Sequence, residues 1–234
     1  MLAPFQILSP EWSIPSVKAC TLLAADLKGN PVSFSQHTPL GLACRETLEA
    51  LLKPITWIRQ VHGDTIVELP MQGRPDADAS FTFQKNTVCA VLTADCLPVV
   101  FARTDGSTVG VVHAGRRGIE IGLLEKMVRQ LGNPSSLLVW IGPGIAAKSY
   151  PVSAEMRHDF LIDNSDWSFV FKEGAPGQFY MDLYQIAKLQ LLRSGILAKH
   201  LSGAQWDTFT NPLLHSARRD RETSGRMATL VWMD

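Results

Sequence analysis

The succession of predicted strands and helices places this chain in the α+β (mixed α/β) class, with packed β-sheets and helices on the outside. Predicted strands come in consecutive groups, for example over residues 87–95, 97–103 and the apolar run that ends at His113. Only some strands alternate with predicted helices, such as the one over 119–131. Because 46% of the residues are hydrophobic, the chain has ample material for a sizeable core.

The N-terminal half is predicted to contain one long helix among several strands. The helix over 38–52 ends before Pro54, because proline cannot continue a helix. Two strands follow around a bend at His62 and Gly63, and the glycine is expected to let the backbone turn sharply and point the histidine outward. The ranges of the strands in this half are 17–25, 55–61, 64–69 and 77–83, with a turn at 28–31.

The C-terminal half alternates helices with shorter strands. The helix over 119–131 is amphipathic, since its leucines, Met127 and Val128 fall on one face. Ser153 and Asp182 have the side chains of helix N-caps, and Gly195 is suited to a helix end. The predicted helices therefore run over 153–161 and 182–194, and the predicted strands over 137–141, 167–171 and 227–233.

Composition narrows the class of protein. Twenty-two basic and 22 acidic residues give a formal net charge of zero, which argues against nucleic-acid or membrane-surface binding driven by long-range charge. The four cysteines show no paired spacing, which is typical of a reducing compartment. With no secretory signal in the first residues and no apolar run long enough to cross a bilayer, we expect a cytoplasmic protein of one domain, residues 1–234.

Polar residues inside apolar strands mark the candidate functional site. Asp95 and Cys96 interrupt the first strand of the pair around 87–103, and His113 stands where the next strand ends. Burying such groups is costly unless each finds a partner. One thiolate and two imidazoles, the second from His62, are a donor set for tetrahedral Zn2+ with the fourth position open. The alternative is a core cysteine and structural histidines, because the three residues lack zinc-finger spacing.

Two arginines follow the second strand and are candidates for substrate binding. Arg116 and Arg117 lie between Gly115 and Gly118, at the predicted start of a helix. A guanidinium binds phosphate in bidentate fashion, and a helix N-terminus favours an anion. The alternative is that both arginines are solvated or pair with acidic residues of the helix.

Six motifs occur in order along the chain: QVHGD (60–64), TADCLPV (93–99), HAGRRG (113–118), IGPGI (141–145), SARRD (216–220) and SGRMA (224–228). Together they resemble the YfiH family, which is also labelled polyphenol oxidase, laccase domain or purine nucleoside phosphorylase. The resemblance implies a sandwich of two mixed β-sheets flanked by helices. It also implies that His62, Cys96 and His113 are zinc ligands.

The same resemblance implies phosphorolysis and deamination of purine nucleosides such as adenosine and inosine, with phosphate as the second substrate. Asp95 is then the candidate general acid or base for the leaving base, and its alternative is a corner residue that accepts backbone N–H groups. Asp78 is either a second-shell partner of a ligand histidine or a strand-start residue. Gln60, in the QVHGD segment, joins Arg116 and Arg117 as a candidate substrate-binding residue.

The chain departs from the family pattern at three places. An N-terminal Thr-Arg-x-Gly-Gly segment of the family is replaced by LLAADLKGN, residues 22–30. Arg116 stands where the family usually has tryptophan, and Pro151 where it has glutamate. The missing tryptophan removes a stacking contact that the family pattern implies and adds a charge, whereas no role is assigned to Pro151.

Other classes of function remain open. Cys96 and His113 could form a thiolate–imidazolium pair that hydrolyses an amide, for instance in peptidoglycan-precursor editing, a role also attributed to family members. A His/His/Cys site can also bind Cu2+, although six histidines are few for a multicopper oxidase. Finally, the metal could be purely structural in a protein that binds a partner.

Overall fold

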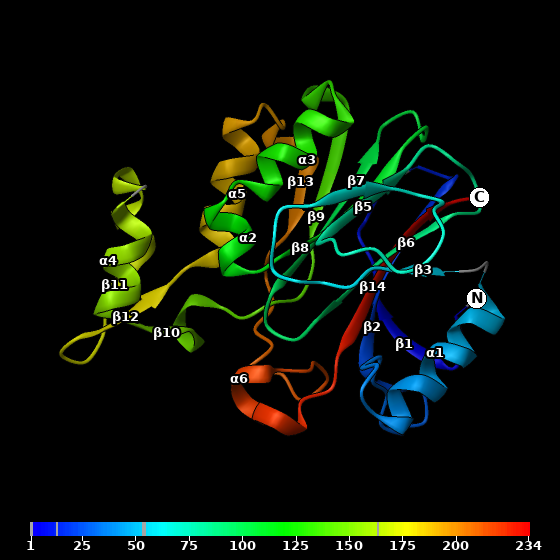
Figure 1. Ribbon diagram of the computed structural model, residues 1–234, viewed down its shortest axis with the longest axis horizontal. Coiled ribbons are helices and arrows are strands. Elements are labelled where there is room, and N and C mark those ends of the chain that lie inside the picture. The colour runs from blue at the N-terminus through cyan, green and yellow to red at the C-terminus, as the bar shows by residue number, and fades with distance from the viewer. Residues whose placement is uncertain (1, 13, 53–54, 163) are drawn as a thin grey trace.

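The computed structural model describes residues 2–12, 14–52, 55–162 and 164–234, and two β-sheets stacked face to face form its centre (Figure 1). The five-stranded sheet has the order β1 (Phe5–Leu8), β2 (Val17–Asp26), β14 (Met227–Met233), β6 (Val88–Thr93), β3 (Ile55–Trp57). The six-stranded sheet has the order β13 (Leu201–Gly203), β9 (Leu137–Ile141), β7 (Leu97–Arg103), β8 (Val109–Ala114), β5 (Ala79–Thr82), β4 (Ile66–Glu68).

Both sheets are mixed, which confirms the predicted fold class. Most neighbouring strands are antiparallel, but β3 runs parallel to β6, β4 to β5 and β13 to β9. β6 belongs to one sheet and β7 to the other, so the short link between them carries the chain across the sandwich. The same link carries the TADC motif.

Side-chain alternation explains why the central strands are apolar throughout. On β6, Val88 and Ala90 face a core under a helix, whereas Cys89 and Val91 face the core between the two sheets. Successive side chains of a strand point to opposite faces, so a strand covered on both faces needs an unbroken apolar run. Cys89 is accordingly a core residue, with a fully buried side chain.

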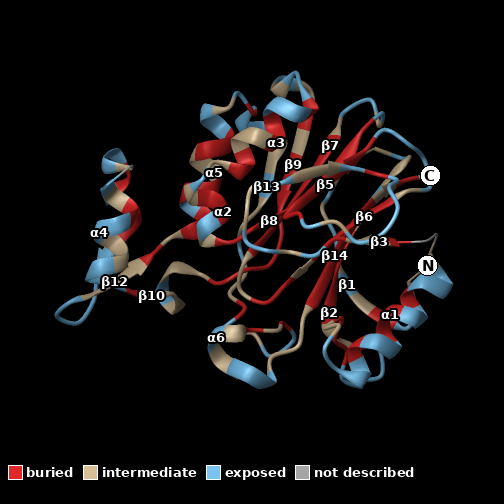
Figure 2. Ribbon diagram, viewed as in Figure 1, coloured by how far each residue is buried: buried red, intermediate tan, exposed pale blue. Residues whose placement is uncertain are grey.

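Helices cover the outer faces of the sandwich. α1 (Pro39–Leu51) packs on the five-stranded sheet, and α2 (Arg116–Glu120), α3 (Leu123–Leu131) and α5 (Leu183–Arg193) pack on the six-stranded sheet. Their buried faces are turned towards the strands (Figure 2). The single helix predicted over 119–131 is two helices, because Gly122 adopts φ +76° between them.

A smaller antiparallel sheet projects from one side of the sandwich and was not predicted (Figure 1). It comprises β10 (Pro151–Ser153), β12 (Gln178–Met181) and β11 (Phe171–Glu173), with α4 (Ala154–Ile162) beside it. The strand predicted over 167–171 is wrong. Residues Ser165–Val170 form the 3-10 helix η3, because Trp167 and Val170, three residues apart, bury one face of a helical turn.

The helix caps agree with the sequence. The Oγ1 atom of Thr38 accepts a hydrogen bond from the Gly41 N–H (3.1 Å) at the start of α1, and Asp182 caps α5 through the Gln185 N–H (2.9 Å). Pro54 lies outside the described residues. No described helix combines the length and the apolar character that crossing a bilayer requires. The remaining short elements are η1 (Pro134–Ser136), η2 (Ala147–Ser149), η4 (Ala198–His200), α6 (Ala217–Asp220) and η5 (Arg221–Thr223).

Close packing between β8 and its neighbours predicts a large effect of one methyl group. A Cβ on Gly110 would lie 2.3 Å from Met127 Cε and 3.0 Å from both Phe81 Cβ and the Ser80 carbonyl oxygen. We expect Gly110→Ala to lower the free energy of unfolding by about 1–3 kcal/mol, measured by urea denaturation. Thr104→Ala, in the exposed turn between β7 and β8, is the control and should change it little. Equal stability of the two variants would contradict this account of the packing.

Candidate metal centre

Cys96 lies at the corner where the chain leaves one sheet for the other. Asp95, just before it, adopts φ +85°, a left-handed conformation that is uncommon for a residue with a side chain. Its carbonyl oxygen accepts a hydrogen bond from the Ile145 N–H (2.9 Å), which anchors the corner to the segment after β9. The thiol is half-buried and faces a cavity.

His113 is held in place from behind by a carboxylate. It lies opposite Pro98 in the β7–β8 ladder, and its backbone N–H donates to the carbonyl oxygen of Asp78 (2.7 Å). Its ring Nδ1 lies 2.8 Å from Asp78 Oδ1, so Nε2 remains for another ligand. Asp78 therefore orients the ring of His113, as predicted, and fixes which ring nitrogen is available.

The same carboxylate also holds the loop that carries His62. Asp78 accepts hydrogen bonds from the backbone N–H groups of Val61 (3.1 Å), His62 (3.0 Å) and Gly63 (2.7 Å). His62 itself adopts φ +59°, so the histidine, and not the glycine as expected, takes the left-handed conformation of the bend. The hydrogen bonds to Asp78 stabilise this conformation, which a side chain otherwise disfavours.

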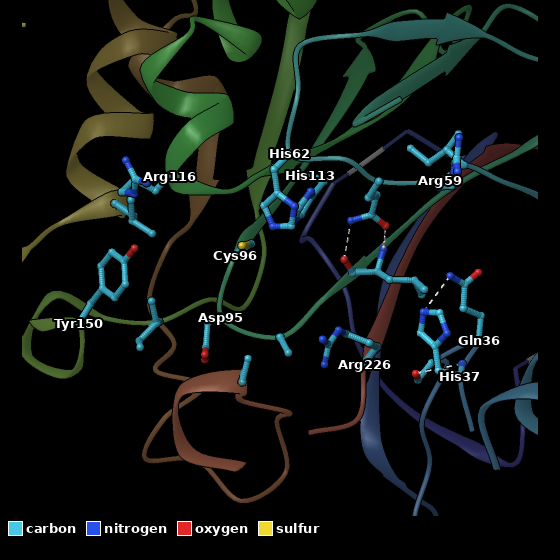
Figure 3. A pocket seen from close by; sticks show the side chains of 18 of the residues that line it. Gln36, His37, Arg59, His62, Asp95, Cys96, His113, Arg116, Tyr150 and Arg226 are labelled. Atoms are coloured by element: carbon cyan, nitrogen blue, oxygen red, sulfur yellow. Dashed lines mark hydrogen bonds between the residues drawn. The ribbon is translucent and has the colours of Figure 1, made fainter. Parts of the chain in front are cut away.

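The structure brings the three predicted ligands together. One donor atom from each of His62, Cys96 and His113 lies within 4.8 Å of the others, and the two imidazole centroids are 4.8 Å apart at 81° (Figure 3). A Cβ on Gly115 would lie 3.1 Å from the sulfur, so this glycine allows the backbone to pass close to the site. One sulfur and two imidazole nitrogens fit zinc, and the same set can also bind copper.

Charge interactions favour the ionised thiol. Burial opposes ionisation of Cys96, but the neighbouring His113 and His62 outweigh it and lower its pKa to about 6. Burial also disfavours the charged form of His113, but Cys96 and Asp78 raise its pKa to about 9. Burial raises the pKa of Asp78, but the hydrogen bonds from His113 and from the loop lower it by more, so the pKa lies below its usual value. A thiolate is the form of cysteine that binds metals and acts as a nucleophile.

A cavity of about 420 Å³ opens beside the three ligands, a size that suits a small-molecule ligand. Arg116 and Tyr150 line one side, and His37 and Arg226 line another (Figure 3). Among the described residues, the trio is the one group of three or more His, Cys, Asp or Glu side chains placed to hold a metal ion. A purely structural metal would be expected to have four protein ligands and no cleft beside it. Here three predicted ligands lie beside an open cavity, which does not fit a purely structural site.

Two predicted site residues line the cavity but use their side chains for hydrogen bonds within the protein. The Gln60 amide donates to the Leu92 carbonyl oxygen (2.8 Å) and accepts from the Leu92 N–H (2.7 Å), so it fastens the loop to β6. The Asp95 carboxylate accepts hydrogen bonds from Thr208 Oγ1 (2.6 Å) and from the Arg218 N–H (2.7 Å). Both residues therefore position the walls of the cavity.

The two predicted anion-binding arginines differ. Arg116 lines the cavity, and its guanidinium pairs with Glu120 one turn along α2. Arg117 is exposed and is not among the residues that line the cavity. For Arg116, the structure therefore agrees with the alternative prediction that the arginine pairs with an acidic residue of the helix. Further along the chain, Arg219 forms an ion pair with Asp220.

Sequence reasoning missed the part of the cavity wall formed by residues 35–37 and by Arg74. The 35–37 segment precedes α1, and no motif marks it. Its place is decided by backbone hydrogen bonds to the start of β14, where the Phe34 N–H donates to the Arg226 carbonyl oxygen (2.9 Å). Arg226 was within reach of sequence reasoning, because it lies in the SGRMA motif.

The fold and the site together define a class of protein: an α+β sandwich with a Cys/His/His site beside an open cavity. The family described as "Multi-copper polyphenol oxidoreductase laccase" matches residues 42–234. The chain belongs to this family, within which it resembles the YfiH-type proteins.

Individual relatives can be aligned with this chain over nearly its whole length. A Pseudomonas aeruginosa protein named purine nucleoside phosphorylase is 33% identical over 97% of this chain and 98% of its own length. The Shigella flexneri purine nucleoside phosphorylase YfiH is 34% identical over 97% of this chain and 99% of its own. The crystal structure of Neisseria meningitidis NMB0706 superposes with a TM-score of 0.86 at 29% identity, covering 97% of this chain and 99% of that one.

The position of Asp78 predicts its effect on metal affinity. In Asp78→Asn the side chain keeps one acceptor oxygen, so it cannot serve both the His113 ring and the His62 loop. We expect the affinity for Zn2+ to fall about 10–100-fold, measured by competition with a chromogenic chelator. Asp64→Asn, which removes an exposed carboxylate paired with Lys126, is the control and should bind zinc like the unmodified protein. Equal zinc affinity of the two variants would argue against the role assigned to Asp78.

Proposed function

We propose that this protein is a zinc-dependent purine nucleoside phosphorylase that also deaminates adenosine, and that it acts on adenosine, inosine and related nucleosides. The observation that carries the proposal is the convergence of His62, Cys96 and His113 beside a cavity that can admit a nucleoside. The names of the relatives from P. aeruginosa and S. flexneri support the same substrate class.

In phosphorolysis a phosphate oxygen forms a bond to the ribose C1′ as the bond from C1′ to the base nitrogen breaks. The electron pair of that bond leaves with the base, which takes up a proton, and the products are ribose 1-phosphate and the free base. A bound zinc ion supplies a Lewis acid that polarises substrate atoms and makes water more acidic. The cavity walls contribute by holding both reactants in line and by excluding bulk water.

Asp95 is the proposed acid or base for the departing base. It lines the cavity next to the ligand Cys96, and its carboxylate is oriented by Thr208 and by the N–H of Arg218. Both oxygens already accept a hydrogen bond, so a proton transfer through Asp95 requires that it exchange one of these partners for the substrate. Arg116 and Tyr150 lie on the side of the trio away from His37 and Arg226 (Figure 3).

Deamination of adenosine is proposed for the same cavity. A water oxygen attacks C6 of the base, the C6–N bond breaks, and the amino group leaves as ammonia with a proton from the water. This reaction needs no phosphate, so the two activities can be measured independently in one preparation. That independence allows the binding of phosphate to be tested apart from the binding of nucleoside.

The proposal predicts that both activities depend on the metal site. We expect Cys96→Ser to lower turnover of inosine with phosphate, and of adenosine without it, by more than about 100-fold. Loss of a direct ligand should exceed the 10–100-fold effect typical of an outer-shell partner. The measurement is product formation by chromatography, with the zinc content determined in parallel.

Cys44→Ala is the matched control, because it removes a thiol buried between α1 and the five-stranded sheet, away from the cavity. It should retain both activities. Removal of zinc by a chelator should abolish turnover, and addition of zinc should restore it. Undiminished turnover in the metal-free protein would exclude the proposed mechanism.

A second candidate function is supported by one specific contact. Cys96, His113 and Asp78 form a continuous thiol–imidazole–carboxylate series, with Asp78 on the far ring nitrogen of His113. This order is typical of cysteine hydrolases, in which the imidazole activates the thiol and the carboxylate orients the imidazole. The substrate class would be an amide, such as a peptidoglycan precursor.

Alkylation separates the two candidates. If the hydrolase is the true activity, iodoacetamide should modify Cys96 rapidly in the zinc-loaded protein, and amide hydrolysis should be lost in step. If the phosphorylase proposal holds, zinc coordination should protect the thiol, and removal of zinc should expose it. A copper-dependent oxidase, which the family description suggests, would instead require that Cu2+ support oxidation of a phenol.

A further inference from the structure

The cavity is lined by four arginines, and two of them are neutralised by a neighbouring carboxylate. Arg59 forms an ion pair with Asp76, and Arg116 forms one with Glu120. The other two, Arg74 and Arg226, have no carboxylate partner within ion-pair distance among the described residues. The positive charges of Arg74 and Arg226 are therefore not compensated by a neighbouring carboxylate among the described residues.

Hydrogen bonds hold Arg226 in place, although no carboxylate among the described residues neutralises its charge. Its backbone N–H donates to Ser33 Oγ (3.1 Å), and its Nη1 donates to the carbonyl oxygens of Ser224 (3.0 Å) and Gly225 (2.8 Å). Gly225 lies against the His215 ring so closely that a Cβ would come within 2.3 Å of it. The Nε and Nη2 donors of Arg226 have no acceptor in the described part of the chain, and Figure 3 shows the guanidinium directed into the cavity.

A third arginine raises the positive potential behind this wall. Arg45 is buried in α1, and its Nε donates to the carbonyl oxygen of Phe34 (2.8 Å). Its Nη2 is buried without a hydrogen-bond partner among the described residues. Burial and the nearby charge of Arg74 lower the pKa of Arg45 to about 10, although the charge of Glu49 opposes this shift. Clusters of positive charge attract anions.

We propose that Arg226, with Arg74 in the same cavity, forms a phosphate subsite on the side of the metal ligands that faces His37, away from Arg116 and Tyr150. The identity of the anion rests on the proposed phosphorylase function, whereas the existence of the subsite does not. A guanidinium with three free donors can bind two phosphate oxygens at once, and here it needs no reorganisation to do so. Arg116 would then contact the nucleoside or only support α2.

The test is the binding of inorganic phosphate to the zinc-loaded protein, measured by isothermal titration calorimetry. We expect Arg226→Ala to raise the Kd for phosphate about 10–100-fold, the loss typical of hydrogen bonds to a charged group. Arg226→Lys should restore part of the affinity, because it keeps the charge but loses the bidentate geometry. Arg129→Ala, which removes an exposed arginine of α3 outside the cavity, should bind phosphate like the unmodified protein.

Kinetics provide the second readout. In Arg226→Ala the KM for phosphate should rise by the same factor, whereas the zinc content should match that of the unmodified protein. Adenosine monophosphate serves as a second probe, since tighter binding of the nucleotide than of inorganic phosphate would assign the subsite to a substrate phosphate. If Arg226→Ala alters folding, as shown by circular dichroism, Arg74→Ala and Arg226→Lys carry the test.

The outcomes separate this inference from the proposed function. Phosphate binding that depends on Arg226 in a protein without nucleoside turnover would overturn the function and leave the subsite standing. Phosphorolysis with an unchanged phosphate KM in Arg226→Ala would overturn the subsite and leave the function standing. Absence of saturable phosphate binding in the unmodified protein would also overturn the subsite.

Discussion

One buried carboxylate holds the candidate site together. Asp78 is fully buried, and its oxygens accept hydrogen bonds from the ring of His113 and from three backbone N–H groups of the loop around His62. A buried charge is costly unless its hydrogen bonds are satisfied, and here they are satisfied by groups from two separate parts of the site. The strand that carries His113 and the loop that carries His62 are therefore fixed to the same residue.

Cys96 reaches this point because of how the two sheets are connected. The chain passes from β6 to β7 across the sandwich, and Cys96 lies at that crossing. The interior between the sheets is apolar, so the crossing is one of the few places where polar side chains can gather beside a core and still reach a cavity. The site thus has a rigid back, formed by the sheets, and an open front, formed by loops and α2.

The distribution of charge divides the cavity into two ends. Arg116 is neutralised by Glu120, and it lies on the same side of the metal ligands as the aromatic ring of Tyr150. On the other side, the guanidinium of Arg226 is held by backbone carbonyl groups that leave its charge uncompensated. A substrate with an apolar, stacking part and an anionic part matches this division.

The fold class and most central elements could be predicted from sequence patterns, because alternation and unbroken apolar runs indicate how many faces of a strand are buried. The family motifs likewise indicated His62, Cys96 and His113 as candidate metal ligands. The three-dimensional structure was needed to show the wall of residues 35–37 and the break at Gly122. It also decided which arginines keep a free charge, because pairing depends on where side chains distant in sequence come to lie. Local sequence patterns indicate which residues are buried, but they do not indicate which side chains pair with one another.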